Sequence, residues 1–129
     1  MHVDLGPGAV ALSRGDVEAA ISGFGETLRH DPDNLAVRMA LGDTQFRARQ
    51  YCEAVETYWS VLERDPVLTS STAPAEEELD DALANALFAW ATLAPALRRR
   101  ELMAWLARYR MRFGRRTEDL RAAELALRS

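Results

Sequence analysis

The sequence contains no lysine, one cysteine and only two histidines among its 129 residues. Because Cys52 stands alone, it can form neither an internal disulfide nor a thiolate metal cluster. His2 and His30 have no second His, Cys or acidic residue at ligand spacing, so we expect no metal site. No run of about 18 uncharged apolar residues occurs, which excludes a membrane-spanning helix.

The motifs that carry catalysis or cofactor binding are also missing. The sequence has no Walker loop, dinucleotide-binding fingerprint, nucleophile elbow or zinc motif. Glu76–Glu78, Asp80 and Asp81 could bind a divalent cation, but the helix dipole also favours acidic residues at the solvated start of a helix, and we favour that interpretation. We therefore predict that the protein is not an enzyme and needs no cofactor.

Composition also indicates a source and a location. All 16 basic residues are arginine, and arginine and alanine have GC-rich codons, which favours a bacterial genome. The first ten residues lack the basic and apolar regions of a signal peptide. From these features we expect a bacterial protein of the cytoplasm.

Charge is distributed unevenly along the chain. Residues 1–97 contain 6 Arg and 16 acidic residues, a net charge of −10, whereas residues 98–129 contain 10 Arg and 4 acidic residues, a net charge of +6. The two ends are therefore expected to carry opposite electrostatic fields. Head-to-tail association of such a chain would give a homo-oligomer.

A displacement of 34 residues aligns the first half of the chain with itself. Small residues recur where two antiparallel helices must approach closely, and apolar residues spaced i, i+4 give each second helix a stripe. A proline ends each second helix, because the residue before a proline disfavours the helical region. The matched pairs are Val3/Val37, Gly8/Gly42, Ala20/Ala54, Leu28/Leu62 and Asp31-Pro32/Asp65-Pro66, with conservative pairs Leu5/Met39, Leu12/Phe46, Ile21/Val55 and Phe24/Tyr58.

These residues resemble the tetratricopeptide repeat, which has a small residue in its first helix, Ala and then an aromatic residue in its second, and a closing proline. The resemblance covers residues 1–66, about half of the chain. It implies an all-α fold, a right-handed stack of antiparallel helix pairs whose first helices line a concave, peptide-binding groove. Two departures are that Gly6-Pro7-Gly8 delays the first helix and that Arg49 replaces the turn glycine represented by Gly15.

Beyond Pro66 the 34-residue period is lost. Residues 68–75 are polar and contain a proline, so we predict a flexible loop there. In the helix that follows, Ala84 would be the small residue of a degenerate third repeat, displaced by an insertion of about eight residues. The apolar stripe of that helix consists of Leu79, Leu83, Leu87 and Trp90.

The last part of the chain predicts two more helices. Pro95 begins the first of them and Gly114 ends it, and Thr117 caps a final helix whose polar back suits the end of a stack. The whole chain then forms one domain, with repeats at about 1–34 and 35–68, the loop, a degenerate pair at 76–113 and a cap at 117–128. The seven predicted helices are 7–14, 16–30, 34–48, 50–64, 76–93, 95–112 and 117–127.

The resemblance implies that a partner-binding groove is lined by the first helix of each repeat. An alternative for its apolar members, above all Leu12 and Phe46, is that they only pack between helices. The candidate residues are Leu5, Ala9 and Leu12 from the first repeat, Met39, Asp43, Phe46 and Arg47 from the second, and Asp81, Asn85 and Phe88 from the third.

Related proteins that grip the carboxylate tails of heat-shock chaperones use Asn, Lys and Arg in this groove. Here Asp43 occupies a place where that clamp has Asn, Lys is absent, and Asn85 matches a clamp Asn only in the assumed third register. A carboxylate ligand would be repelled by Asp43 and Asp81, so we reject that ligand. An apolar segment with some basic character fits better.

A second candidate surface is the arginine-rich end of the chain. Arginines interleaved with Trp105 and Tyr109 resemble a nucleic-acid footprint, with charges for phosphates and aromatic rings for stacking. The arginines wrap around the helix instead of forming one stripe, which favours a solvated face or a docking site for an acidic protein. The residues are Arg98, Arg99, Arg100, Arg108, Arg112, Arg115 and Arg116.

The sequence thus predicts an adaptor or chaperone-like scaffold that binds a partner polypeptide segment in a concave, partly apolar groove. The alternatives are that the arginine-rich helices bind nucleic acid or an acidic protein surface, or that the protein self-assembles through its groove or its charged ends. Among these partners nucleic acid is the less favoured, and no membrane partner is expected.

Overall fold

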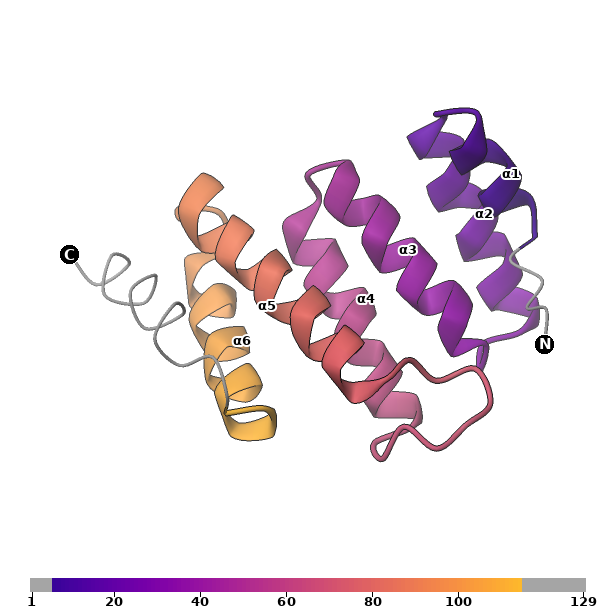
Figure 1. Cartoon of the computed structure of the whole chain (residues 1–129). Helices are drawn as coiled ribbons and strands as arrows, with labels where there is room; N and C mark the ends of the chain where they lie inside the picture. The colour runs from indigo at the N-terminus through magenta and orange to yellow at the C-terminus, as the bar shows by residue number, and fades with distance from the viewer. Residues whose placement is uncertain (1–5, 115–129) are drawn as a thin grey trace.

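The computed structural model describes residues 6–114, and these residues form six α-helices and no strand (Figure 1). An all-helical fold was predicted and is confirmed. The seventh predicted helix, 117–127, lies outside the described residues. The helices are α1 (Pro7–Ser13), α2 (Val17–His30), α3 (Leu35–Arg47), α4 (Tyr51–Arg64), α5 (Glu76–Leu93) and α6 (Arg99–Arg112).

The helices pack as three successive pairs, α1 with α2, α3 with α4 and α5 with α6 (Figure 1). Adjacent pairs are joined by contacts of α2 with α3 and of α4 with α5, and α3 also contacts α5 directly. Each pair therefore packs mainly on its neighbours in the row, which is the arrangement that a helical repeat produces.

The 34-residue period corresponds to one contact that occurs twice. A Cβ atom on Gly8 would lie 2.5 Å from Cδ1 of Phe24, and a Cβ atom on Gly42 would lie 2.4 Å from Cε1 of Tyr58. Both distances are too short for real atoms, so only glycine lets the aromatic ring of the second helix approach the first helix this closely. The helix boundaries repeat as well, because Asp31 and Asp65 leave the helical region ahead of their prolines, with φ of −137° and −145°.

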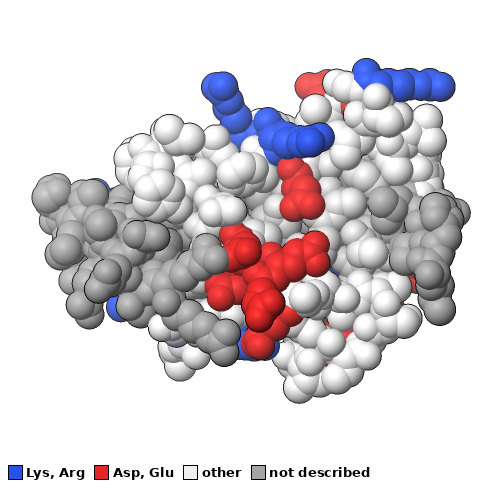
Figure 2. All heavy atoms as spheres, viewed as in Figure 1, with Lys and Arg blue, Asp and Glu red and all other residues white. Residues whose placement is uncertain are grey.

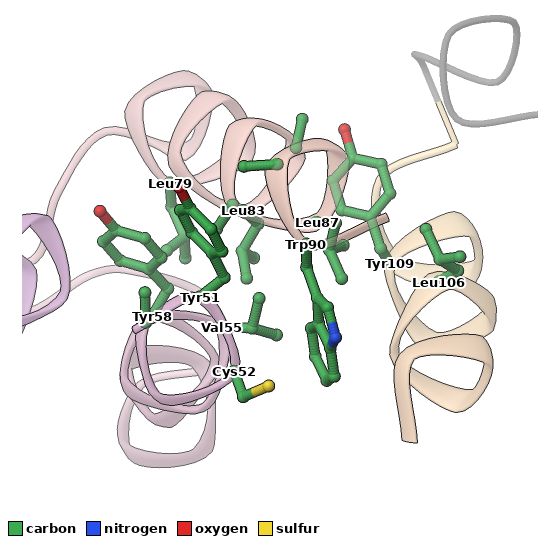
Figure 3. Close-up of a cluster of buried hydrophobic side chains, with 14 of the residues drawn as sticks. Tyr51, Cys52, Val55, Tyr58, Leu79, Leu83, Leu87, Trp90, Leu106 and Tyr109 are labelled. Atoms are coloured by element: carbon green, nitrogen blue, oxygen red, sulfur yellow. The ribbon is translucent and has the colours of Figure 1, made fainter. Parts of the chain in front are cut away.

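The main core lies between α3, α4, α5 and α6, and a smaller one, with Ala20, Phe24 and Val37, lies between the first helices. The predicted stripe of α5 is buried in the main core, and Figure 3 shows the Trp90 indole pointing into the space between α4 and α6. Cys52 is also in this core. Burial raises the pKa of its thiol, which keeps the sulfur protonated and poorly nucleophilic.

The start of α6 differs from the prediction. Pro95 does not begin a helix, because residues 94–98 form turns and α6 starts at Arg99. Arg98 has a left-handed φ of 50°, and the Trp90 indole N–H donates to the carbonyl of Leu97 at 2.7 Å. These two features fix a turn at the place where Pro95 predicted the first turn of a helix.

The loop predicted at residues 68–75 makes hydrogen bonds to residues that precede it in the sequence. The Thr72 hydroxyl oxygen accepts from the backbone N–H of Leu35 at 3.0 Å and donates to the carbonyl of Asp33 at 3.2 Å. Asp65 accepts from the backbone N–H of Ser70 at 2.7 Å, and this hydrogen bond holds the pKa of Asp65 below its usual value. The loop is therefore tied to the beginning of α3. None of the helices described over residues 6–114 combines the length and the apolar character needed to cross a membrane.

Arg49 explains how the second repeat turns without its glycine. Gly15 has φ of 80° and Arg49, 34 residues later, has φ of 63°, so both adopt the left-handed conformation. Because a side chain disfavours this conformation, we expect Arg49→Gly to raise the free energy of unfolding by about 1 kcal/mol. Urea denaturation monitored by circular dichroism measures it.

The matched control is Gly15→Ala, which places a Cβ at the equivalent turn. The site has open space, with no atom within 4 Å of such a Cβ, so only the backbone conformation is tested. We expect it to lower the free energy of unfolding by about 1 kcal/mol. Changes of the same sign in both variants would contradict the equivalence of the two turns.

Candidate binding groove

Two adjoining hollows run along α3 and form one groove. The first has a volume of about 510 Å³ and the second of about 360 Å³, and Ala40 and Asp43 line both. The first is lined by Leu12 of α1, by Ala40, Asp43, Thr44, Phe46 and Arg47 of α3, by Tyr58 of α4, and by Ala82 and Asn85 of α5. The second is lined by Ala36, Met39, Ala40 and Asp43 of α3, by residues 71–74 of the loop, and by Glu78 of α5. We call these two hollows together the groove.

Residues 11–67 of the chain match a family model described as tetratricopeptide repeat. Residues 11–67 therefore form tetratricopeptide repeats. No curated protein sequence matches the chain. Tetratricopeptide repeats generally mediate interactions between proteins and are typically non-enzymatic. The match covers α2, α3 and α4 together with the last three residues of α1, and it ends before α5.

The structure brings most of the expected groove residues of the repeats together. Leu12, Asp43, Phe46, Arg47 and Asn85 line the first hollow, and Met39 lines the second. The rest lie elsewhere. Ala9 packs against the smaller core, Asp81 and Phe88 are exposed on α5 about one turn from Asn85, and Leu5 is outside the described residues.

The apolar members of the groove both line it and pack between helices, the two roles that the sequence left open. Leu12 and Phe46 are half-buried, and each packs against a core while lining the first hollow. Phe46 also contacts Tyr51 edge to face, with the ring centroids 5.6 Å apart. Met39 is only 6% exposed and belongs to the main core. A charge at Met39 would therefore disrupt packing, and this position cannot report on binding alone.

Asp43 is held in place from the second helix of its own repeat. The buried Tyr58 hydroxyl donates to Oδ1 of Asp43 at 2.6 Å. Burial raises the pKa of Tyr58, and the hydrogen bond to Asp43 and its negative charge raise it further. Tyr58 therefore remains a protonated donor, and the Asp43 carboxylate is fixed on the wall that the two hollows share.

The sequence missed several residues of the groove, and helical spacing could have found some of them. Ala36 and Ala40 lie on the same face of α3 as Asp43, and Glu78 and Ala82 lie on the same face of α5 as Asn85. Residues 71–74 could not be found in this way, because their place depends on the hydrogen bonds of Thr72 and Asp65.

The groove is electrostatically uneven. In Figure 2, which looks onto α3 and α5, acidic side chains gather near the centre, over the beginning of α5 and the neighbouring α3, and basic side chains lie at the upper rim. Asp43 and Glu78 belong to the lining itself, and Glu77 and Asp81 are exposed on α5. Arg47 lies one helical turn beyond Asp43 and lines the first hollow.

The acidic start of α5 also has a structural role. The buried carboxylate of Asp80 accepts from the Tyr109 hydroxyl, and Arg112 donates to Glu76 at 2.6 Å. Both contacts hold α6 against α5. Within residues 6–114 no group of three or more His, Cys, Asp or Glu side chains is arranged to hold a metal ion.

The predicted basic patch is dispersed over α6. Arg98 forms ion pairs with Glu101 at 2.9 Å and with Glu56 at 3.5 Å, and Glu101 raises the pKa of Arg98. Arg108 lies over the Trp105 ring, 4.6 Å from its centroid, and Arg112 is paired with Glu76. Arg99 and Arg100 are exposed, and Arg115 and Arg116 lie outside the described residues. Several of these charges are thus already engaged within the molecule.

Proposed function

We propose that the protein is an adaptor or chaperone-like scaffold that binds a segment of a partner polypeptide in the groove. The observation that carries this proposal is the continuity of the groove. Three successive helix pairs and the loop contribute to it, and it offers half-buried apolar side chains beside exposed polar ones. A bound segment can bury apolar surface there and still direct its polar groups to the rim.

The arginine-rich helix is the weaker candidate for the binding surface. Ion pairs with Glu56, Glu101 and Glu76 already neutralise Arg98 and Arg112 in part. A nucleic acid or an acidic protein would have to compete with these carboxylates for the same guanidinium groups. A segment that binds the apolar lining of the groove does not have to displace an ion pair of the protein. The groove is therefore the better candidate for the binding surface.

Filling the groove from an exposed position should abolish binding without unfolding the protein. Asn85 is exposed on α5 and lines the first hollow, so Asn85→Trp would occupy it. We expect random dodecapeptides displayed on phage to be enriched on the wild-type protein and at least tenfold less on Asn85→Trp. Sequencing the recovered pools measures the enrichment.

The matched control is Ala104→Trp, which adds the same side chain to an exposed position of α6, a helix that contributes no residue to either hollow. It should enrich the same peptides as the wild-type protein. Equal enrichment on all three proteins, or none on the wild type, would contradict binding in the groove. Circular dichroism should show the same helix content in all three.

A further inference from the structure

The groove contains a carboxylate whose position suggests a particular class of partner. We propose that the groove selects a segment with an arginine or lysine side chain, which enters the second hollow between Asp43 and Glu78, while aliphatic neighbours of that residue fill the first hollow. This inference rests on the proposed function, because it specifies the chemistry of the segment that the groove binds.

Two carboxylates from different helices line the second hollow. Asp43 comes from α3 and Glu78 from α5, and both are exposed. A cation placed between them would face a negative charge on each wall, whereas a carboxylate placed there would be repelled by both. Complementary charge thus favours a basic side chain in this hollow.

Asp43 is oriented as well as charged. The Tyr58 hydroxyl donates to Oδ1 at 2.6 Å and occupies only one of the acceptor positions of the carboxylate. Because Tyr58 is buried with its ring against Gly42, its hydroxyl is a fixed donor that orients Asp43 on the wall of the groove. A donor on the partner then meets a preorganised acceptor, which reduces the entropy lost on binding. Tyr58 is a positioning residue in this arrangement.

The first hollow favours the opposite kind of side chain. Leu12, Phe46 and Ala82 give it apolar walls, and Arg47 would repel a second cation there. The side-chain stem of the bound arginine or lysine can lie along Ala36 and Ala40, which have no bulk to obstruct it. The two hollows therefore predict one basic residue with aliphatic residues on one side of it.

The selected peptides test the charge preference directly. We expect the pool enriched on the wild-type protein to contain arginine and lysine well above their frequency in the starting library, with aspartate and glutamate below theirs. On the double variant Asp43→Asn, Glu78→Gln this bias should disappear. Asparagine keeps the shape of Asp43 and still accepts from Tyr58, so this variant removes charge with little change in packing.

A double-mutant cycle then measures the contact itself. For the most enriched peptide, replacing its basic residue with glutamine should weaken binding to the wild-type protein by about tenfold. A loss of this size is typical when a charge-assisted hydrogen bond is removed. The same change should weaken binding to the double variant by less than twofold. Fluorescence anisotropy of the labelled peptides gives both ratios. Tyr58→Phe should reduce the wild-type ratio of the two peptide affinities to about threefold, because Asp43 then loses the hydroxyl that orients it.

The outcomes separate this inference from the proposed function. The basic-segment inference would be overturned by a peptide pool without basic bias, or by an equal loss of affinity on the wild-type protein and the double variant when the basic residue is replaced. Peptide binding that Asn85→Trp abolishes would still support the groove in that case. Peptides that bind Asn85→Trp as tightly as the wild-type protein would overturn both. An acidic pool would indicate recognition by Arg47 and would also overturn the inference.

Discussion

Replacing Trp90 with alanine is expected to lower the free energy of unfolding by about 3–5 kcal/mol, the largest loss that we predict for this chain. The indole is fully buried among residues of α4, α5 and α6, and its N–H donates to the carbonyl of Leu97 at 2.7 Å (Figure 3). Alanine would leave a cavity where three helices meet and an unpaired carbonyl in the turn before α6. Urea denaturation followed by circular dichroism measures the loss.

A matched control lies on the same helix. Phe88 is also a large aromatic residue of α5, but its side chain is 47% exposed. Phe88→Ala should therefore change the free energy of unfolding by no more than about 0.5 kcal/mol. If Trp90→Ala cost no more than Phe88→Ala, the α5–α6 pair would not be packed on the tetratricopeptide repeats in the way described.

Gly42→Ala is expected to lower the free energy of unfolding by about 1–3 kcal/mol, although alanine is the better helix former. The new methyl group would lie 2.4 Å from the Tyr58 ring, so α3 and α4 would have to move apart. The same movement would displace the Tyr58 hydroxyl from Asp43, so a loss of peptide binding should accompany the loss of stability. Thermal or urea denaturation measures the first effect and fluorescence anisotropy the second.

Gly25→Ala makes the same substitution where there is room for it. Gly25 lies inside α2, and no atom is within 4 Å of a Cβ built on it. It should stabilise the protein by about 0.5–1 kcal/mol, because alanine loses less backbone entropy in a helix. The two glycine variants should thus change stability in opposite directions. Stabilisation by both, in equal measure, would indicate a propensity effect alone and would contradict a close approach of α3 to α4 at Gly42.

The parts of the fold that could be predicted are those set by short-range rules. Pro32 and Pro66 act on the residue before them, and Gly8 and Gly42 recur because the same ring contact recurs, so the period and the boundaries of α2 to α4 could be identified in the sequence. The start of α6 could not, because the turn before it is fixed by the distant Trp90 indole N–H and by a left-handed Arg98.

The candidate site could be predicted only in part for the same reason. The family resemblance pointed to Asp43, Phe46 and Asn85 through their places on the first helices, and all three line the groove. It gave no information on whether Met39 is exposed, because a helix with neighbours on two sides has no single polar face. It also missed Tyr58, since the hydroxyl of a core residue reaches the groove only through the geometry of the α3–α4 pair.

The most direct test of binding in the groove is to map where a bound peptide contacts the protein. Two-dimensional NMR spectra of the ¹⁵N-labelled protein would be recorded during titration with the most enriched peptide. We predict that the largest amide shift changes occur along α3 and the facing part of α5, around Asp43, Phe46 and Asn85, and that α6 changes little. Changes confined to α6, around Arg99, Arg100 and Arg108, would contradict binding in the groove and would favour its arginine-rich surface.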